Sequence, residues 1–239
     1  MTGGILLSAL TLGFVLGLKH ALDPDHMVAV STIVSESQSI KRSSLVGTLW
    51  GLGHTLSLLC AGVLVIALKI GVSDRAALWM EFAMALMLIL LGLKAILKSL
   101  SGWKLHRHRH THDGSTHMHL HLHRGGDERV HGHRHVIGFA ARPFFVGMVH
   151  GMAGSASLML LVLATIPSAV AGMIYIAVFG LGSVGGMLIM SSLISLPFVL
   201  TRKHFNVLSE GLQGAVGSLS VTFGLFLAWQ YAFREHLIF

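Results

Sequence analysis

Charged side chains are scarce in this sequence. Asp, Glu, Lys and Arg make up 11% of its 239 residues, while 53% are hydrophobic and the mean hydropathy is +0.73. Soluble domains carry roughly 25% charged residues, so the composition excludes an ordinary globular protein and predicts an all-α integral membrane protein. The formal charge of +7 is concentrated in a few loops, which favours membrane orientation over nucleic-acid binding as its role.

Cysteine is nearly absent as well. Cys60 is the only one, which excludes an intrachain disulfide framework and a thiol-pair redox relay. The sequence also lacks a glycine-rich phosphate-binding loop, so any active step needs an ion gradient or a partner ATPase.

Long apolar stretches are plentiful, and a membrane span needs about 20 such residues. Six stretches meet this length: 4–35, 44–68, 76–98, 139–165, 168–200 and 207–233. The first is too long for one straight crossing and contains Asp23-Pro24-Asp25. Because proline removes a backbone donor and disfavours helix at the preceding residue, we expect a broken helix here. Free backbone groups in hydrocarbon need protein or water, so the break should line a cavity.

Basic residues indicate the orientation of these spans. With six spans, Lys41-Arg42, the segment 101–142 and Arg202-Lys203 fall on one side of the membrane. Fewer basic residues fall on the other side: Lys69, Arg75 and Arg234. The positive-inside rule then predicts a multi-pass protein of a bacterial-type inner or plasma membrane, with the segment 101–136 in the cytoplasm and both termini outside.

The two halves of the chain resemble each other at an offset of 129 or 130 residues. "GLKHALDPDH" aligns with "GMVHGMAGSA", which pairs His20 with His150, and "WGLGHTLSL" aligns with "FGLGSVGGM", which pairs His54 with Ser183. Glu81 and Glu210 are separated by the same offset. Three spans per half require the halves to insert in opposite directions, as in secondary transporters whose sites lie at the repeat interface. The predicted organisation is a three-helix repeat at 1–100, a loop at 101–136 and an inverted repeat at 137–239.

Ionisable residues cluster in "HALDPDH", residues 20–26. On a continuous helix His20, Asp25 and His26 would not share one face, but an unwound segment at Pro24 can turn all three toward one point. Imidazole with carboxylate suits Ni, Co, Cu or Zn dications, and ionisable residues inside membranes are costly and functional by default. We therefore expect these three to bind a metal ion or a proton. For Asp23, a ligand role competes with capping of the second half-helix.

Two further histidines are candidate ligands. His54 lies between small residues in "GLGHTLSL", so it is either a packing residue or part of the site. His150 occupies the repeat position of His20 but has no carboxylate near it in sequence. The candidate metal set is therefore His20, Asp23, Asp25, His26, His54 and His150.

The loop 101–136 contains eleven of the seventeen histidines, most of them at every second position. It has few apolar residues, so we expect a flexible, solvated segment. Such tracts bind borderline divalent metals with low specificity, which favours metal buffering over an incidental titratable linker.

"KHALDPDH" together with "GLGHT" resembles the signatures of the nickel/cobalt transporter superfamily, in which a His-x4-Asp-His motif in one helix is followed by a Gly-His-Ser/Thr motif in the next. The six-span size is similar to the shorter branch, which includes urease-accessory-type nickel permeases and nickel/cobalt efflux proteins. The resemblance implies transport of Ni²⁺ or Co²⁺ through a site that contains His20, Asp25, His26 and His54. Lys19 stands where this family usually has arginine, and Pro24 where it has a small residue.

The predicted function is therefore metal transport, not enzymatic catalysis, with the ion as cargo and no prosthetic group. Uptake and export both stay open, with uptake preferred. A cytoplasmic metallochaperone and an energy-coupling partner are the partners to consider besides the lipid bilayer. Two alternatives remain: a membrane-embedded accessory protein that delivers metal to a nickel enzyme, and a di-iron oxygenase with histidine boxes, for which four intramembrane histidines are too few.

Overall fold

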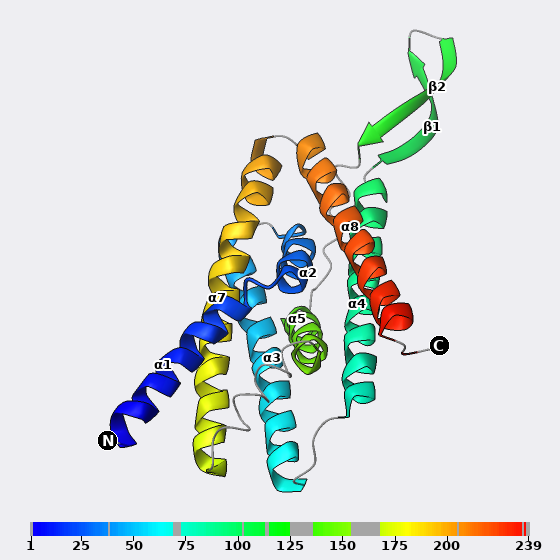
Figure 1. Cartoon of the computed structure of the whole chain (residues 1–239). Coiled ribbons are helices and arrows are strands. Elements are labelled where there is room, and N and C mark those ends of the chain that lie inside the picture. The colour runs from blue at the N-terminus through cyan, green and yellow to red at the C-terminus, as the bar shows by residue number, and fades with distance from the viewer. Residues whose placement is uncertain are drawn as a thin grey trace.

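The structure, a computed structural model, describes residues 2–37, 39–68, 73–101, 103–112, 115–124, 136–153, 168–204, 206–235 and 237. Its helices are α1 (Thr2–His20), α2 (Pro24–Val34), α3 (Ile40–Leu68), α4 (Asp74–Ser101), α5 (Val136–Met152), α7 (Ala169–His204) and α8 (Asn206–Trp229), and a π-helical turn, η1 (Gln230–Arg234), follows α8 (Figure 1). Two strands, β1 (Trp103–His112) and β2 (Ser115–Arg124), pair as an antiparallel hairpin.

The helical body is that of a multi-pass membrane protein, as the composition predicts. Within the described residues, four helices are long and apolar enough to cross a membrane: Ile40–Val65, Asp74–Leu100, Ala169–Thr201 and Val207–Arg234. They correspond to four of the six expected spans. Large apolar side chains cover their outer faces, for example Leu90, Val170 and Leu225. In water such surfaces would aggregate, whereas in a bilayer they face lipid.

The remaining two expected spans differ from single long helices. The first consists of two shorter helices, α1 and α2, and the apolar part of α1 is Leu7–His20. For the span expected at 139–165, α5 covers the first part, and residues 154–167 lie outside the described residues. The count of six spans therefore stays a prediction.

The break between α1 and α2 lies where Pro24 predicts it. α1 ends at His20, and α2 begins with Pro24 at its first position, where the missing backbone donor costs nothing. Between them the chain makes a tight turn, in which the amides of Leu22 and Asp23 donate to the carbonyls of Lys19 and His20 at 2.8 and 3.1 Å. The turn thus keeps its own backbone groups satisfied inside the apolar body.

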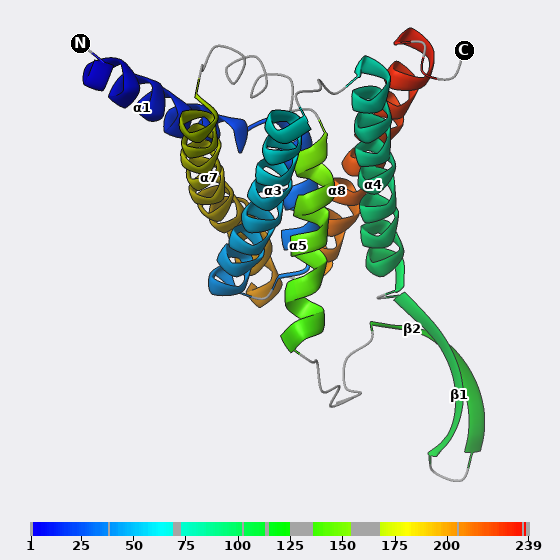
Figure 2. The same cartoon turned by 90° about the horizontal axis from the view of Figure 1, so that it is seen from below.

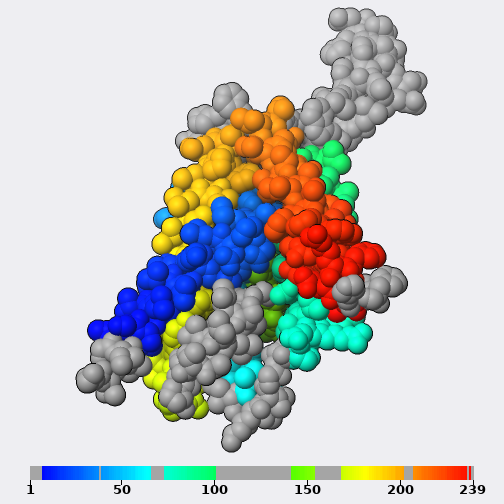
Figure 3. All heavy atoms as spheres, viewed as in Figure 1, coloured from blue at the N-terminus to red at the C-terminus, as the bar shows by residue number. Residues whose placement is uncertain are grey.

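The short helix α2 lies in the middle of the molecule. Its residues Ala29, Val30 and Val34 are buried in a core with Trp50 of α3 and Leu88 of α4. Figure 2 shows α2 in blue behind α3 and α5, and in Figure 3 the blue surface of α1 and α2 lies between α7 and α8 below the point where these two helices meet. The second half of the broken span is therefore the central element.

Corresponding helices of the two halves run in opposite directions. α3 packs against α7 and α4 packs against α8, and in Figure 1 each of these pairs is antiparallel. α1 packs on α7 in the way that α5 packs on α3. We infer that the halves are inverted repeats, because inversion predicts both the directions and the exchange of partners.

The closest contacts between helices show the same correspondence between the two halves. A Cβ atom on Gly17 would collide with the carbonyl of Phe179, and one on Gly147 would collide with that of Trp50, its repeat counterpart. The contact of Gly182 with Phe14 has its counterpart in that of Gly53 with Phe144, described below. Glycine at these positions lets α1 approach α7, and α5 approach α3, at backbone distance.

An ion-pair group fixes the C-terminal end of α2. The Glu36 carboxylate lies 3.0 Å from Nζ of Lys98 and 3.9 Å from Nζ of Lys94, both on α4. Burial alone would raise the pKa of Glu36, but the neighbouring ammonium groups outweigh this effect and hold the pKa below its ordinary value. The contribution of Glu36 to stability is therefore present near neutral pH and is lost as acid protonates it.

The histidine-rich tract forms a hairpin over part of its length. Residues 103–112 pair with 115–124, whereas residues 125–135 lie outside the described residues. We did not predict these strands from the sequence, although histidine at every second position also has the period of a β-strand. The expectation that the segment 101–136 is flexible stays a prediction. The hairpin extends from the end of α4, at the end of the molecule where α7 meets α8 (Figure 1).

The glycine contacts lead to a stability prediction. Gly53→Ala and Gly182→Ala place a methyl group against the carbonyls of Phe144 and Phe14. Each should cost about 1–3 kcal/mol, as overpacked cores do, and should lower the temperature at which detergent-solubilised protein loses its monodisperse peak. Gly211→Ala in α8, where a Cβ meets nothing within 4 Å, is the matched control and should not destabilise. Equal behaviour of all three variants would contradict close helix packing at these glycines.

Candidate metal site

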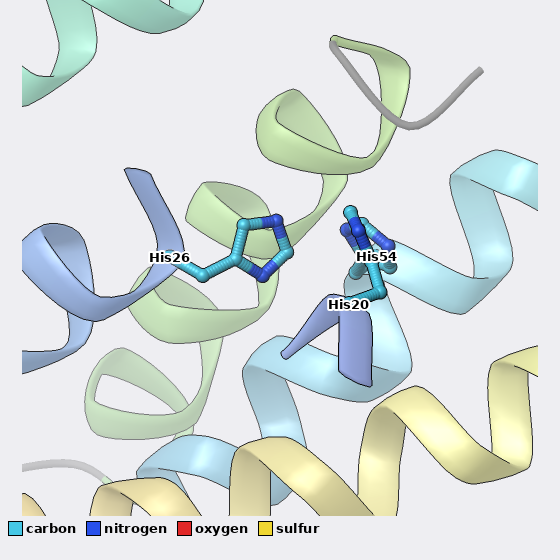
Figure 4. A group of neighbouring side chains, drawn as sticks. All are labelled: His20, His26 and His54. Atoms are coloured by element: carbon cyan, nitrogen blue, oxygen red, sulfur yellow. The ribbon is translucent and has the colours of Figure 1, made fainter. Parts of the chain in front are cut away.

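The structure brings all six candidate residues together. His20 is the last residue of α1, Asp25 and His26 lie in the first turn of α2, and His150 lies in the last turn of α5. His54 comes from the middle of α3. The site is therefore built around the helix break, and Figure 4 shows the rings of His20, His26 and His54 close to one another.

Three imidazoles make the first group, which we call the α3 set: His20, His26 and His54. One ring nitrogen of each lies within 4.8 Å of the others, and the ring centroids are 4.4 to 5.2 Å apart. His26 and His54 are 1% and 0% exposed, and His20 is 9% exposed. Three neutral nitrogens at this spacing can converge on one ion.

A second group, the α5 set, consists of Asp25, His26 and His150. Its ligand atoms also lie within 4.8 Å of one another. Nε2 of His150 is 2.8 Å from Oδ2 of Asp25, and Nε2 of His26 is 3.9 Å from the same oxygen. The ring centroids of His26 and His150 are 4.2 Å apart, so His26 belongs to both sets. No carboxylate lies near His150 in the sequence, but the fold brings the carboxylate of Asp25 next to it.

Asp23 pairs with His20 instead of capping α2. It occupies the cap position, but its side chain makes no capping hydrogen bond. Its Oδ2 lies 2.7 Å from Nδ1 of His20. The sequence could not separate these roles, because both need a carboxylate one residue before Pro24. With a protonated Nδ1 donating to Asp23, Nε2 of His20 is left as the acceptor.

Several buried ring nitrogens lack hydrogen-bond partners in the described part of the chain. They are Nε2 of His20, Nδ1 of His26, Nδ1 of His150 and both nitrogens of His54. A buried polar atom without a partner costs about 1–3 kcal/mol, so such a concentration in one place needs an explanation. A purely structural histidine would satisfy at least one nitrogen, and His54 does not. The pattern is that of a site open to a ligand.

Two aromatic residues that the sequence did not single out border the site. The ring of Trp50 stacks 5.7 Å from that of His26 and lies 5.5 Å from that of His150. The ring of Phe179 lies 5.6 Å from that of His20. Trp50 and Phe179 are repeat counterparts, so the internal alignment was the signal that could have identified them. They close the site with apolar surface and hold the imidazoles in place.

Such a donor set selects a class of ions. Buried imidazoles with one carboxylate suit borderline divalent ions such as Ni²⁺, Co²⁺ and Zn²⁺, whereas Ca²⁺ and Mg²⁺ prefer oxygen ligands. We call His20 and His150 the outer imidazoles. Each of them contacts a carboxylate: His20 contacts Asp23, and His150 contacts Asp25. The arrangement can therefore bind a borderline dication inside the apolar body.

Comparison with known proteins identifies several relatives. The model of the NicO family, described as high-affinity nickel-transport protein, matches residues 6–228. The chain is 40% identical over 238 residues to urease accessory protein UreH of Bacillus sp. (strain TB-90), covering 97% of this chain and 95% of that protein. No solved structure matches the chain.

Two plant proteins are more distant relatives. Chloroplast proteins FOR GROWTH AND FERTILITY 2 and 1 of Arabidopsis thaliana are 29% and 30% identical over 189 and 186 residues. Both matches cover 77% of this chain, which spans 45% and 48% of the length of these two relatives.

The position of Trp50 provides a direct test of ion binding. In a full-length chain with Trp79, Trp103 and Trp229 changed to Phe and the tract histidines changed to Gln, Ni²⁺ should quench the fluorescence of Trp50 saturably, because a paramagnetic ion at His26 would lie next to the indole. His26→Ala should abolish the saturable quenching. A matched chain that keeps only Trp79, which is 50% exposed on α4, is the control and should show none. Equal quenching of both indoles would contradict an ion site beside Trp50.

Proposed function

The chain belongs to the NicO family of high-affinity nickel-transport proteins, and from this membership we propose that it carries Ni²⁺, and also Co²⁺, through the site formed by the α3 and α5 sets. The family match covers nearly the whole helical body, and it confirms the resemblance to nickel/cobalt transporters. It also confirms the expectation of a membrane protein that is not an enzyme. The ion is cargo, not a resident cofactor.

One observation carries the proposed route: the unpartnered imidazoles are buried at the break of a membrane helix. Ionisable groups in this position are expensive, and they are retained in membrane proteins along ion pathways. Broken helices at repeat interfaces are also where secondary transporters bind their substrates. Asp25 lies in the first turn of α2, where the helix dipole stabilises its charge, and the carboxylate in turn attracts a cation.

Asp23 is proposed to orient His20 and not to bind the ion directly. Its carboxylate contacts Nδ1 of His20 and leaves Nε2 of that ring without a partner among the described residues, an arrangement that raises ligand basicity and fixes the tautomer. The Asp23 side chain is 45% exposed. An exposed carboxylate within the span of a membrane protein needs water, so we propose that this side of the break opens to an aqueous path.

The orientation proposed from the basic residues is supported by the fold. The hairpin and the C-terminal end of α7 lie at one end of the molecule (Figure 1), and the basic residues Arg202 and Lys203 belong to the last turn of α7. We place this end in the cytoplasm and both termini outside. In this orientation the histidine-rich tract meets cytoplasmic metal, where it would buffer incoming Ni²⁺, and uptake is the direction proposed.

A second candidate function is supported by the name of the bacterial relative. Urease accessory protein suggests a protein that supplies metal for the assembly of an enzyme, and a membrane-embedded delivery protein with a cytoplasmic metallochaperone partner would fit that description. Metal flux in proteoliposomes that contain only this chain separates the two functions. A transporter moves Ni²⁺ without the partner, and a delivery protein does not.

Substitution of the site tests the transport proposal. His20→Ala, Asp25→Ala and His26→Ala should each lower radiolabelled nickel flux by about tenfold or more, because loss of one ligand leaves too few donors for the dication. Asp74→Asn, at the exposed start of α4, is the matched control and should transport normally. Near wild-type flux in any two of the three site variants, at equal insertion, would refute the proposed route.

Deletion of residues 106–135 tests the buffering role. The deletion removes the histidine-rich tract but none of the buried imidazoles, so maximal nickel flux should be retained and only its dependence on metal concentration should change. The measurement is initial flux over a range of free Ni²⁺ concentrations. Complete loss of flux in a monodisperse deletion variant would place the tract on the obligatory path.

A further inference from the structure

We propose that the two sets are successive positions of one cargo ion, and that the ion passes between them through the shared imidazole of His26. This inference rests on the proposed transport function and adds to it a two-position route. It assigns different roles to ligands that a single-site description would treat alike: His54 and His150 each serve one position, and His26 serves both.

His26 has the geometry of a shared ligand. Its ring centroid lies 4.4 Å from that of His20 on one side and 4.2 Å from that of His150 on the other, and both contacts are edge-to-face. The ring is 1% exposed, so solvent cannot replace it as a ligand. Two ring nitrogens are available, of which Nε2 lies 3.9 Å from Asp25 and Nδ1 has no partner among the described residues.

The internal symmetry relates the two positions. His20 and His150 are repeat counterparts, and each lies against an aromatic ring of the opposite half. The centroid distances are 5.6 Å for His20 with Phe179 and 5.5 Å for His150 with Trp50. The surroundings of His20 in one half therefore correspond to the surroundings of His150 in the other half. His26 contacts both of these imidazoles.

The two sets differ in charge. The α3 set offers three imidazoles and no carboxylate of its own. The carboxylate of Asp23 contacts Nδ1 of His20 and acts on this set only through that ring. The α5 set presents the Asp25 carboxylate directly. Because both sets need His26, and because two dications this close would repel strongly, only one position can be filled at a time.

His26 lies in the first turn of α2, at the end of this helix opposite to the one that the ion pairs of Glu36 fix. α2 has 11 residues and joins α1 through the tight turn at Ala21–Asp23, whereas His54 and His150 belong to α3 and α5, which pack together through Gly53 and Gly151. A small displacement of α2 against this rigid pair would change which outer ligands His26 faces.

The experiment compares one ligand from each set in the full-length chain whose tract histidines are changed to Gln. Co²⁺ is the probe, because its visible absorption reports the ligands and the geometry of its site. His54→Gln leaves the α5 set complete, and His150→Gln leaves the α3 set complete. Both variants should bind a single Co²⁺ per chain with clearly different spectra, while radiolabelled nickel flux in proteoliposomes falls by about tenfold or more in each. His26→Gln should lose both binding and flux.

Three outcomes would overturn the proposal that the ion passes from one set to the other through His26. Loss of Co²⁺ binding in both His54→Gln and His150→Gln, in monodisperse protein, would mean one joint site. Identical spectra would mean that the two variants do not isolate different sets. Near wild-type flux in either variant would mean that one set suffices. Absence of nickel and cobalt flux in the chain that keeps all its site ligands would instead overturn the proposed transport function itself.

Discussion

A helix break inside an apolar span is the constraint on which the rest of the structure depends. Pro24 ends α1 and starts α2, and the tight turn between them satisfies its own backbone amides. The break brings His26 close to His20 in one set and to Asp25 in the other, although on a continuous helix these three residues would not share one face. It also places α2 in the centre of the body, where its apolar side chains form the core and its first turn forms the site.

Small residues hold the two halves of the molecule at the distance that this site requires. Gly17 and Gly147 admit the backbone of the opposite half, at Phe179 and Trp50, at equivalent places. Without a hydrophobic driving force between helices in lipid, such close contact is what holds spans together. The same two aromatic residues then border the outer imidazoles. Packing and the geometry of the candidate site are therefore set by one group of contacts, which explains why the candidate ligands gather where the halves meet.

The chain contains two kinds of histidine. Those in the hairpin and its continuation are numerous and local in sequence, and a tract of this kind binds borderline metals weakly and without a fixed geometry. Those in the helical body are few, buried and held by neighbouring carboxylates and aromatic rings. We attribute concentration of the ion to the first kind and its passage across the membrane to the second.

The sequence by itself determined the features that depend on local chemistry. Composition identified the membrane protein, Pro24 located the break, and the repeat paired His20 with His150 before any geometry was known. Only the tertiary structure decided that Asp25 pairs with His150, that Asp23 binds His20 instead of capping α2, that Trp50 borders the site and that His26 is common to both sets. Local patterns fix where a helix begins and which residue types it carries. The distance between side chains on different helices depends on how closely their backbones approach, and in this protein that approach is set by contacts between residues about 90 to 170 positions apart in the sequence.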